Sequence, residues 1–141
     1  MKSLTDYIEV EQTAIFDKYG VFFAFSKSQL TGGIERLKEK GILTESNKIC
    51  DIGVGGFCPS KNAKAVMDEL DKLYKKGISQ DIEENGLSAI IRRELDNYEY
   101  CITWDITDTY EALKDYPNVT PERIKQELPT WREMRKARDL D

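Results

Sequence analysis

The sequence predicts an α+β fold: a small two- or three-stranded sheet covered by several helices, with a helix-rich C-terminal half. Two short aromatic and β-branched runs, 21–26 and 48–57, predict strands, whereas most other segments repeat apolar residues at helical spacing. A two-stranded sheet is only marginally stable alone, so the helices must cover it. The length of 141 residues and the 40% hydrophobic content fit one domain, 1–141, in which 130–141 could be a partly ordered C-terminal extension.

The first elements have clear boundary signals. Ser3 and Asp6 are spaced like a capping box, which predicts a helix over 4–19 that ends at Gly20. The run 21–26 is apolar at both parities, so we expect a strand buried on both sides. A helix over 28–40 follows, weakened by Gly32 and Gly33.

The middle of the chain predicts a second strand and two helical pieces. Alternation over 48–57 places Cys50 and Ile52 on the same face, before Gly55 and Gly56 end the strand. Ser60 is expected to cap a long helix to about Lys76, whose core stripe is Val66, Met67, Leu70, Leu73 and Tyr74. Gly77 and Gly86 then bracket a short helical piece, 78–84.

The last third predicts helices separated by caps and prolines. Periodicity from Leu87 predicts a helix to about Trp104, although 99–104 has enough β-branched and aromatic residues to be a third strand instead. Asp105 is expected to cap a short helix that stops at Pro117. Thr120 and Pro121 begin another helix, which should stop before Pro129 and be followed by one or two turns to Ala137.

The absence of histidine excludes several classes of chemistry. Ser-His-Asp catalysis, Cys-His catalysis and zinc sites that mix cysteine with histidine all require an imidazole. The formal net charge of −5 argues against direct nucleic-acid binding, which needs a basic surface. No catalytic residue, metal site or cofactor is therefore predicted.

The sequence also indicates a compartment. No apolar run is long enough to span a membrane, and the first residues form a charged helical pattern instead of a signal peptide. Cys50, Cys58 and Cys101 have no spacing typical of a disulfide framework. We therefore expect a cytoplasmic protein without membrane association.

Two features near the second strand allow alternatives. The glycine-rich segment 53–61 could cradle a phosphate at a helix start, but it lacks both the Walker order and the dinucleotide spacing, so a turn or bulge is the simpler interpretation. Cys58 could be a reactive thiol near a helix start and Lys61. A passive core cysteine is the simpler interpretation here, because no general base is available.

The main polar constellation lies in an acidic stretch. Ten acidic and three basic residues lie between Asp81 and Asp115. Such carboxylates can share a proton, hold a divalent cation or form a docking face, and they can also be a solvated helix surface with Asp105 as an N-cap. The candidate binding residues are Glu94, Asn97, Glu99, Asp105 and Asp108.

The basic C-terminal segment 131–138 has opposite charge to this stretch. Trp131 and Met134 lie one helical turn apart, so they could pack on the domain itself or on a partner. The opposite charges suit docking within the chain, and they equally suit a contact between copies, so a homo-oligomer is possible.

Five segments occur in a distinctive order: VFFAFS (21–26), GGFCP (55–59), GISQDIEENG (77–86), RELDNYE (93–99) and DITDT (105–109). Over roughly residues 1–127 the chain resembles an uncharacterised family of small acidic proteins, often encoded by phages and mobile elements, with no assigned activity. The resemblance implies a histidine where this chain has Tyr98 and a glycine where it has Trp104. These departures favour a structural or binding role.

The leading hypothesis is a non-enzymatic accessory or modulator protein that binds another protein through its acidic surface. The phage-like context suggests a host protein as the target. One alternative is a small carboxylate-based enzyme or ligand-binding domain built on Glu94, Glu99 and Asp105, with one carboxyl pKa raised by burial. A second is an acidic mimic of nucleic acid.

Overall fold

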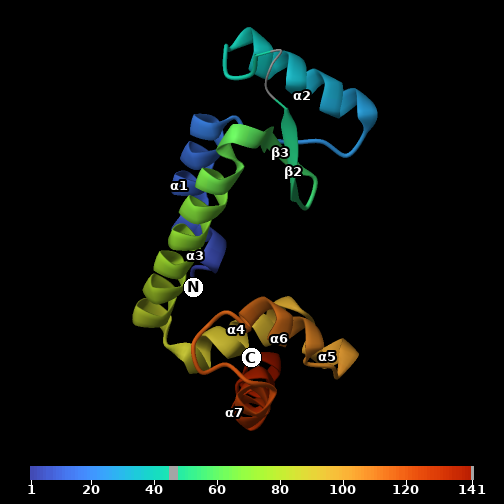
Figure 1. Ribbon diagram of the computed structural model, residues 1–141. Coiled ribbons are helices and arrows are strands. Elements are labelled where there is room, and N and C mark those ends of the chain that lie inside the picture. The colour runs from blue at the N-terminus through green and yellow to red at the C-terminus, as the bar shows by residue number, and fades with distance from the viewer. Residues whose placement is uncertain (45–47, 141) are drawn as a thin grey trace. The chain divides into compact units, whose positions relative to one another are not determined.

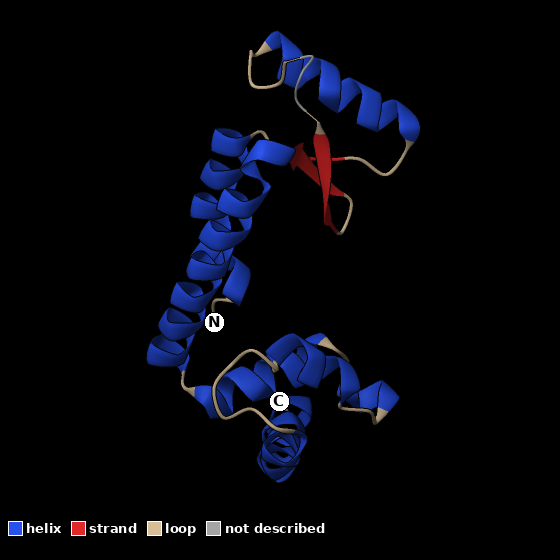
Figure 2. Cartoon of the chain, viewed as in Figure 1, coloured by secondary structure: helices blue, strands red, loops and turns tan. Residues whose placement is uncertain are grey.

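The computed structural model describes residues 1–44 and 48–140 and has the α+β fold that the sequence predicts (Figures 1 and 2). The chain divides into two compact units. Lys2–Gly77 is called the sheet unit, and Ile78–Asp141, which also includes Met1, the helical unit. The single domain over 1–141 stays a prediction.

The sheet unit contains one small antiparallel sheet with strand order β1-β3-β2. Its first helix begins where the capping box predicts, since the Ser3 amide donates a hydrogen bond to the Asp6 carboxylate at 2.8 Å. The elements in chain order are α1 (Leu4–Tyr19), β1 (Phe22–Phe23), α2 (Lys27–Glu39), β2 (Ile49–Gly53), β3 (Gly56–Pro59), a 3₁₀ turn (Ser60–Asn62) and α3 (Ala63–Asn85), which continues into the helical unit.

The run 48–57 forms a hairpin, and this corrects the prediction of one strand. Val54 and Gly55 connect β2 to β3 with φ angles of 51° and 77°, the two positive values that a type I′ hairpin turn requires. The third strand is therefore Gly56–Pro59, and the alternative at 99–104 is wrong because Tyr100–Thr103 is helical. The glycines of segment 53–61 lie at the end of β2, in the turn and at the start of β3, and only Ser60 and Lys61 belong to the 3₁₀ turn before α3, so the glycines form a turn, the simpler of the two interpretations.

Two glycines allow close packing in the sheet unit. A Cβ at Gly33 in α2 would lie 2.2 Å from the Phe22 ring, and one at Gly77 in α3 would lie 2.5 Å from Ile8 of α1. Gly77 was expected to interrupt the helix, yet α3 runs through it. The glycine instead lets α1 and α3 approach closely, which compensates for its low helix propensity.

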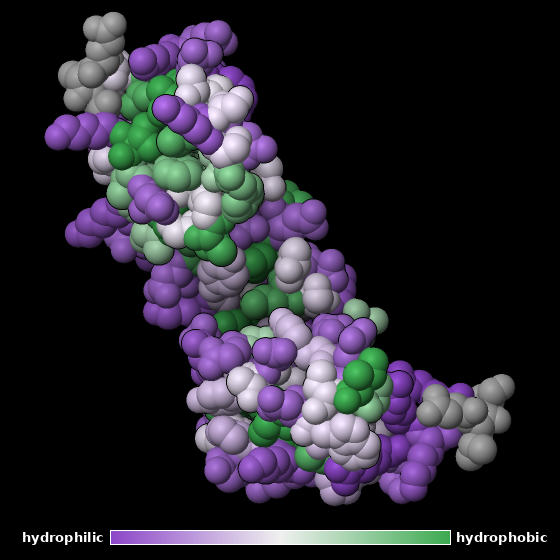
Figure 3. Space-filling view, turned by 90° about the vertical axis from the view of Figure 1, so that its right-hand side faces the viewer, coloured by the Kyte–Doolittle hydropathy of each residue, from purple (hydrophilic) through white to green (hydrophobic). Residues whose placement is uncertain are grey.

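The core of the sheet unit is smaller than the apolar pattern predicts. Ile8, Val66 and Leu73 are buried, but Met67 and Tyr74 are exposed. The strand prediction of burial on both sides is wrong as well, since Phe23 and Phe25 are both exposed. Hydrophobic residues accordingly reach the surface of this unit among hydrophilic ones (Figure 3).

The helical unit is built around α4 (Leu87–Asn97), which packs against α6 (Thr107–Leu113) and α7 (Pro121–Leu140). The short helix α5 (Tyr100–Thr103) lies between α4 and α6 in the chain. The apolar stripe of α4 forms the centre of the core, together with residues of α6 and α7; among the described residues of this unit the fully buried apolar side chains are Ile90, Ile91, Leu95, Leu113 and Ile124.

Three helix boundaries in this unit differ from the sequence prediction. Helix α6 begins at Thr107 with Ile106, not Asp105, as its N-cap residue. The helix from Leu87 stops at Asn97, because Glu99 takes a left-handed conformation with φ 52°. Conversely, α7 continues through Pro129 instead of stopping before it. The buried Trp131 indole, which donates a hydrogen bond to Asp96 at 3.0 Å, holds the segment beyond the proline against α4.

In the part of the chain that the structure describes, every helix is too short or too polar to cross a membrane.

Candidate functional site

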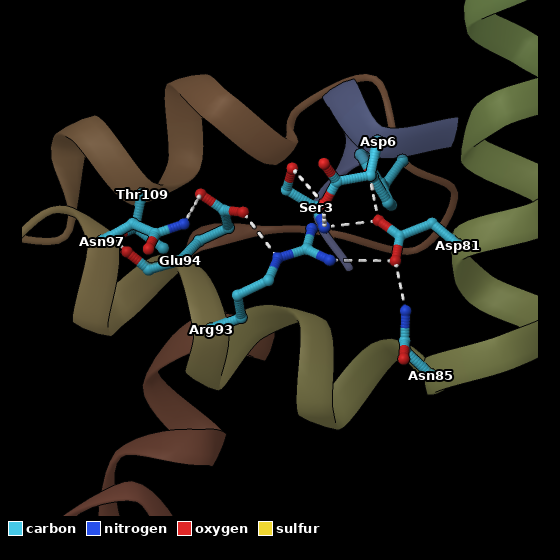
Figure 4. A network of polar contacts seen from close by, with 9 residues as sticks. Ser3, Asp6, Asp81, Asn85, Arg93, Glu94, Asn97 and Thr109 are labelled. Atoms are coloured by element: carbon cyan, nitrogen blue, oxygen red, sulfur yellow. Dashed lines mark hydrogen bonds and ion pairs between the residues drawn. The ribbon is translucent and has the colours of Figure 1, made fainter. Parts of the chain in front are cut away.

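The Asp81 carboxylate is a fully buried charged group of the helical unit, with no exposure to solvent. Arg93 donates to both of its oxygens at 2.9 Å, Tyr116 donates through its hydroxyl at 2.5 Å, and Asn85 donates at 2.8 Å. The Arg93 guanidinium lies between Asp81 and Glu94 and donates to Glu94 Oε1 at 2.8 Å (Figure 4). This cluster joins α3, α4 and the segment after α6.

Hydrogen bonding outweighs desolvation at this cluster. Burial by itself would raise the pKa of Asp81, but the donors Arg93, Tyr116 and Asn85 lower it below its ordinary value of 3.8. Burial also raises the pKa of Tyr116, and the neighbouring Asp81 carboxylate raises it further. At neutral pH the cluster is therefore an ionised Asp81–Arg93 pair with a neutral tyrosine, which is suited to holding helices together.

Of the five predicted binding residues, the structure brings Glu94 and Asn97 together. Glu94 is partly buried in α4, and its second carboxylate oxygen accepts a 3.3 Å hydrogen bond from the Asn97 amide (Figure 4). The Glu94 backbone carbonyl also accepts from the buried Thr109 hydroxyl at 3.4 Å. Glu94 is thus tied to Arg93, Asn97 and α6 within the unit.

The other three predicted residues are exposed and separate from that pair. Glu99 follows α4, and Asp108 lies in the first turn of α6. Asp105 accepts hydrogen bonds from the Thr107 hydroxyl at 2.6 Å and the Thr107 amide at 2.9 Å, which lower the pKa of Asp105. Within the described residues no hydrogen bond or ion pair joins Glu99, Asp105 or Asp108 to Glu94.

Further acidic residues are paired with arginines of α4 and α7. Glu127 accepts from Arg92 at 2.8 Å and from Arg123 at 2.6 Å. Asp96 accepts from the Trp131 indole and forms longer ion pairs, 3.4–3.5 Å, with Arg135 and Arg138. The docking of the basic segment 131–138 onto the acidic stretch within the chain, one of the two alternatives above, is therefore present at Asp96.

The helical unit also contains a hollow that combines aromatic and basic side chains. Its volume is about 220 Å³, and we call it the aromatic pocket. The Tyr100 ring meets the Trp131 ring edge-on at 5.3 Å and lies 6.1 Å from the Trp104 ring. The lining residues are Tyr100, Cys101, Trp104, Trp131, Arg132, Arg135 and Lys136.

Backbone geometry positions this pocket. Glu99 and Trp104, on either side of α5, have φ angles of 52° and 56° in the left-handed region that side chains other than glycine disfavour. Trp104 is 71% exposed, so burial does not compensate for that conformation. The resemblance noted above implies a glycine at this position, and the positive φ is the reason a glycine would suit it.

Sequence reasoning identified Trp131 but missed the aromatic pocket. The sequence feature that could have indicated the pocket is the pair Tyr100 and Trp104, one helical turn apart, together with the basic segment 131–138. The prediction of a long helix concealed it, because that helix places Trp104 at the end of a regular stripe.

The three cysteines differ in burial. Cys58 in β3 is fully buried, and burial raises the pKa of its thiol, as expected of a core cysteine and not of a reactive one near a helix start. Cys50 and Cys101 are partly buried. No group of three or more cysteine, aspartate or glutamate side chains is positioned to hold a metal ion in the described ranges.

Comparison with known proteins gives a family but no activity. No curated protein and no solved structure is significantly similar to the chain. A model of a family of unknown function, DUF7659, matches residues 4–138. This match covers nearly the whole chain and agrees with the uncharacterised family that the sequence resembles. The chain therefore belongs to the family of unknown function DUF7659.

Proposed function

We propose that this chain is a non-enzymatic, cytoplasmic accessory protein that binds another protein, and that the aromatic pocket receives a side chain of that partner. The observation that carries the proposal is Trp104, a large apolar side chain that is 71% exposed on a disfavoured backbone conformation. Such strain persists where the surrounding structure fixes it, and it concentrates at functional sites. The resemblance to phage-encoded proteins supports a host protein as the partner.

The size of the aromatic pocket favours a protein partner over a small ligand. Sites for drug-sized molecules and cofactors usually measure about 300–1,000 Å³. The hollow of about 220 Å³ is smaller, and it matches a site for one anchoring side chain. Interfaces concentrate binding energy in such anchors, and tryptophan, tyrosine and arginine are the residues enriched there.

The charges around the pocket indicate the partner's chemistry. Arg132, Arg135 and Lys136 lie on one face of α7 at the pocket, although the chain as a whole carries a net charge of −5. A basic rim of this kind attracts an acidic segment and fixes its register. We therefore propose an acidic peptide segment with one apolar anchor residue as the target.

Peptide binding tests this proposal. The probes are labelled acidic peptides with a central tryptophan, leucine or alanine, and a matching set in which lysine replaces every acidic residue. Fluorescence anisotropy should show binding only to acidic peptides with a large apolar centre. Trp104→Ala should weaken that binding about 30-fold, the effect of losing one anchor contact, and Arg132→Glu should weaken it as well.

Matched controls separate the pocket from general surface effects. Ile102 is 70% exposed and does not line the pocket, and Lys125 is an exposed basic residue of α7 outside it. Ile102→Ala and Lys125→Glu should leave binding unchanged. The proposal fails if no peptide of the series binds, or if Trp104→Ala binds as tightly as the unaltered protein.

The acidic surface predicted from the sequence is a second candidate contact. Glu99 and Asp108 are exposed, so they are accessible to a basic partner. Charge reversal there, Glu99→Lys with Asp108→Lys, is a sharper test than reversal at Glu94, whose carboxylate binds Arg93 inside the unit. Affinity capture that loses a partner with this double variant, and retains it with Trp104→Ala, would favour the acidic surface.

The two remaining alternatives have less support. A carboxylate enzyme needs a general acid with a raised pKa, whereas the hydrogen bonds from Thr107 lower the pKa of Asp105. A nucleic-acid mimic needs acidic side chains spread over one surface, whereas Asp81, Asp96 and Glu127 bind arginines of their own unit.

A further inference from the structure

Two of the three cysteines lie directly opposite each other in the hairpin of the sheet unit. Cys50 of β2 is the register partner of Cys58 of β3 in the antiparallel ladder. Residues directly opposite in such a ladder project from the same face of the sheet, and their Cα atoms are about 4.5–5.5 Å apart. Disulfides join cysteines whose Cα atoms are about 4.4–6.8 Å apart, so the backbone already has the required spacing.

We propose that Cys50 and Cys58 are a modification site for hydroperoxides, at which oxidation closes a reversible disulfide across the β2–β3 hairpin. Both thiols are free in the structure. The Cys50 thiol donates a hydrogen bond to the Asp51 carbonyl oxygen at 3.6 Å, which disulfide formation would remove. The backbone of the hairpin needs no rearrangement.

The two cysteines differ in exposure, and this assigns their roles. Cys50 is partly exposed, so a peroxide can reach it, whereas Cys58 is fully buried and burial raises the pKa of its thiol. In the first step the Cys50 thiolate attacks one peroxide oxygen and the O–O bond breaks, which gives a Cys50 sulfenic acid; the leaving hydroxide or alkoxide takes up the proton that Cys50 lost and departs as water or an alcohol. In the second step the Cys58 thiol sulfur attacks the Cys50 sulfur and the S–O bond breaks; the hydroxyl group leaves as water with the Cys58 proton, and the S–S bond forms.

Formation of this disulfide would restrict the motion of the β2–β3 hairpin. The sheet order β1-β3-β2 makes β3 the central strand, so the bond would tie the edge strand β2 to it. Beyond β2 the exposed turn residue Val54 lines a second hollow of about 450 Å³, together with Phe23 and Met67. Oxidation should therefore reduce the freedom of the turn at the rim of this hollow.

Peptide mapping of the native full-length protein tests the proposal. Trypsin cleaves after Lys48 and Lys61, so one peptide, Ile49–Lys61, contains both cysteines, while Cys101 lies in another. After treatment with hydrogen peroxide and alkylation, we expect this peptide to be lighter by two hydrogens and unalkylated. Treatment with dithiothreitol before alkylation should restore two alkylated cysteines.

Two variants make the result decisive. Cys50→Ser leaves Cys58 buried, so Cys58 should stay reduced; Cys58→Ala leaves Cys50 without a partner, so Cys50 should collect one or more oxygen atoms instead. The oxidised unaltered protein should also melt roughly 5–10 °C higher than the reduced protein, because the bond restricts the unfolded chain. The proposal is overturned if Cys50 and Cys58 of the treated protein are both alkylated without reduction, or if Cys50 pairs only with a second molecule.

Discussion

The sheet unit and the helical unit use opposite charges in different ways. In the sheet unit the ion pairs of the described residues involve lysines, such as Lys75 with Asp71, whose side chains are 75% and 63% exposed. In the helical unit Arg92, Arg93 and Arg123 form largely buried pairs, and the Arg93 and Asp81 side chains are 9% and 0% exposed. The planar guanidinium can donate to several acceptors at once, which suits a buried position better than a lysine ammonium.

This difference explains what the acidic stretch between Asp81 and Asp115 does in the folded chain. The most buried acidic residues of this stretch form ion pairs that hold helices together. In the sheet unit, close packing around glycines holds the elements together instead. A buried ion pair adds little net stability compared with apolar packing, but removal of one partner leaves an uncompensated charge. Mutations should therefore affect the two units through different mechanisms.

The largest expected effect is the loss of the Arg93 guanidinium. Arg93→Ala leaves the buried Asp81 carboxylate without its main partner, so the free energy of unfolding should fall by about 3–5 kcal/mol. Urea denaturation followed by circular dichroism measures it. Lys75→Ala, which removes an exposed ion pair of the sheet unit, is the control and should have no measurable effect. Equal effects from the two variants would contradict the comparison.

The Tyr116 hydroxyl gives the next effect and a pH dependence. Tyr116→Phe removes a hydrogen bond to a charged group, which should cost about 1.5–3 kcal/mol. Since the folded pKa of Asp81 lies below its ordinary 3.8, its contribution to stability is complete above that pH and is lost as the pH falls through the folded pKa. Without the tyrosine donor this pKa rises, so acid unfolding should begin at higher pH.

Acid titrations of both proteins, monitored by circular dichroism, check this prediction. Tyr110→Phe is a matched control, because no hydrogen bond joins Tyr110 to Asp81 among the described residues. An acid transition of Tyr116→Phe that coincides with that of Tyr110→Phe would show that the hydroxyl does not hold the Asp81 pKa down.

Neighbouring glycines in α2 should give opposite results in the sheet unit. Gly33→Ala places a Cβ 2.2 Å from the Phe22 ring, so the ring must move, and we expect a loss of about 1–3 kcal/mol. At Gly32 the nearest atom is 3.6 Å away, at the flexible end of Arg36. Gly32→Ala should therefore stabilise the helix by about 0.5–1 kcal/mol. Thermal unfolding of both variants measures the signs, and a gain at both positions would refute the close packing.

These glycines also show which parts of the fold the sequence could predict. Helix α1 was predicted at its observed bounds, because Ser3, Asp6 and Gly20 are local signals that act within one turn. Gly77 and Pro129 are equally local signals for a break, but contacts distant in sequence override them: Ile8 packs against Gly77, and Trp131 binds Asp96 beyond the proline. The hairpin was missed because Val54 is an unusual residue for a turn with positive φ.

The candidate site was predictable to a similar degree. The acidic stretch pointed to Glu94 and Asn97, which do lie together in the structure. No sequence signal shows that the Glu94 carboxylate is already bound by the Arg93 guanidinium. The aromatic pocket depends on left-handed conformations at Glu99 and Trp104, which neither residue type favours. Backbone strain of this kind becomes visible only in the folded structure.

The smallest expected effect comes from a left-handed backbone conformation in the sheet unit, at Val54. Val54 is 94% exposed, and its φ of 51° is unfavourable for a β-branched residue. Asparagine tolerates the left-handed region and is favoured in type I′ turns, so Val54→Asn should raise the free energy of unfolding by up to about 1 kcal/mol. Thermal unfolding measures this gain, and Val10→Asn, at an 83% exposed position within α1, is the control that should show none. If Val54→Asn destabilises the protein instead, the valine side chain makes a stabilising contact at the hollow that it lines, and the strain there has a packing explanation.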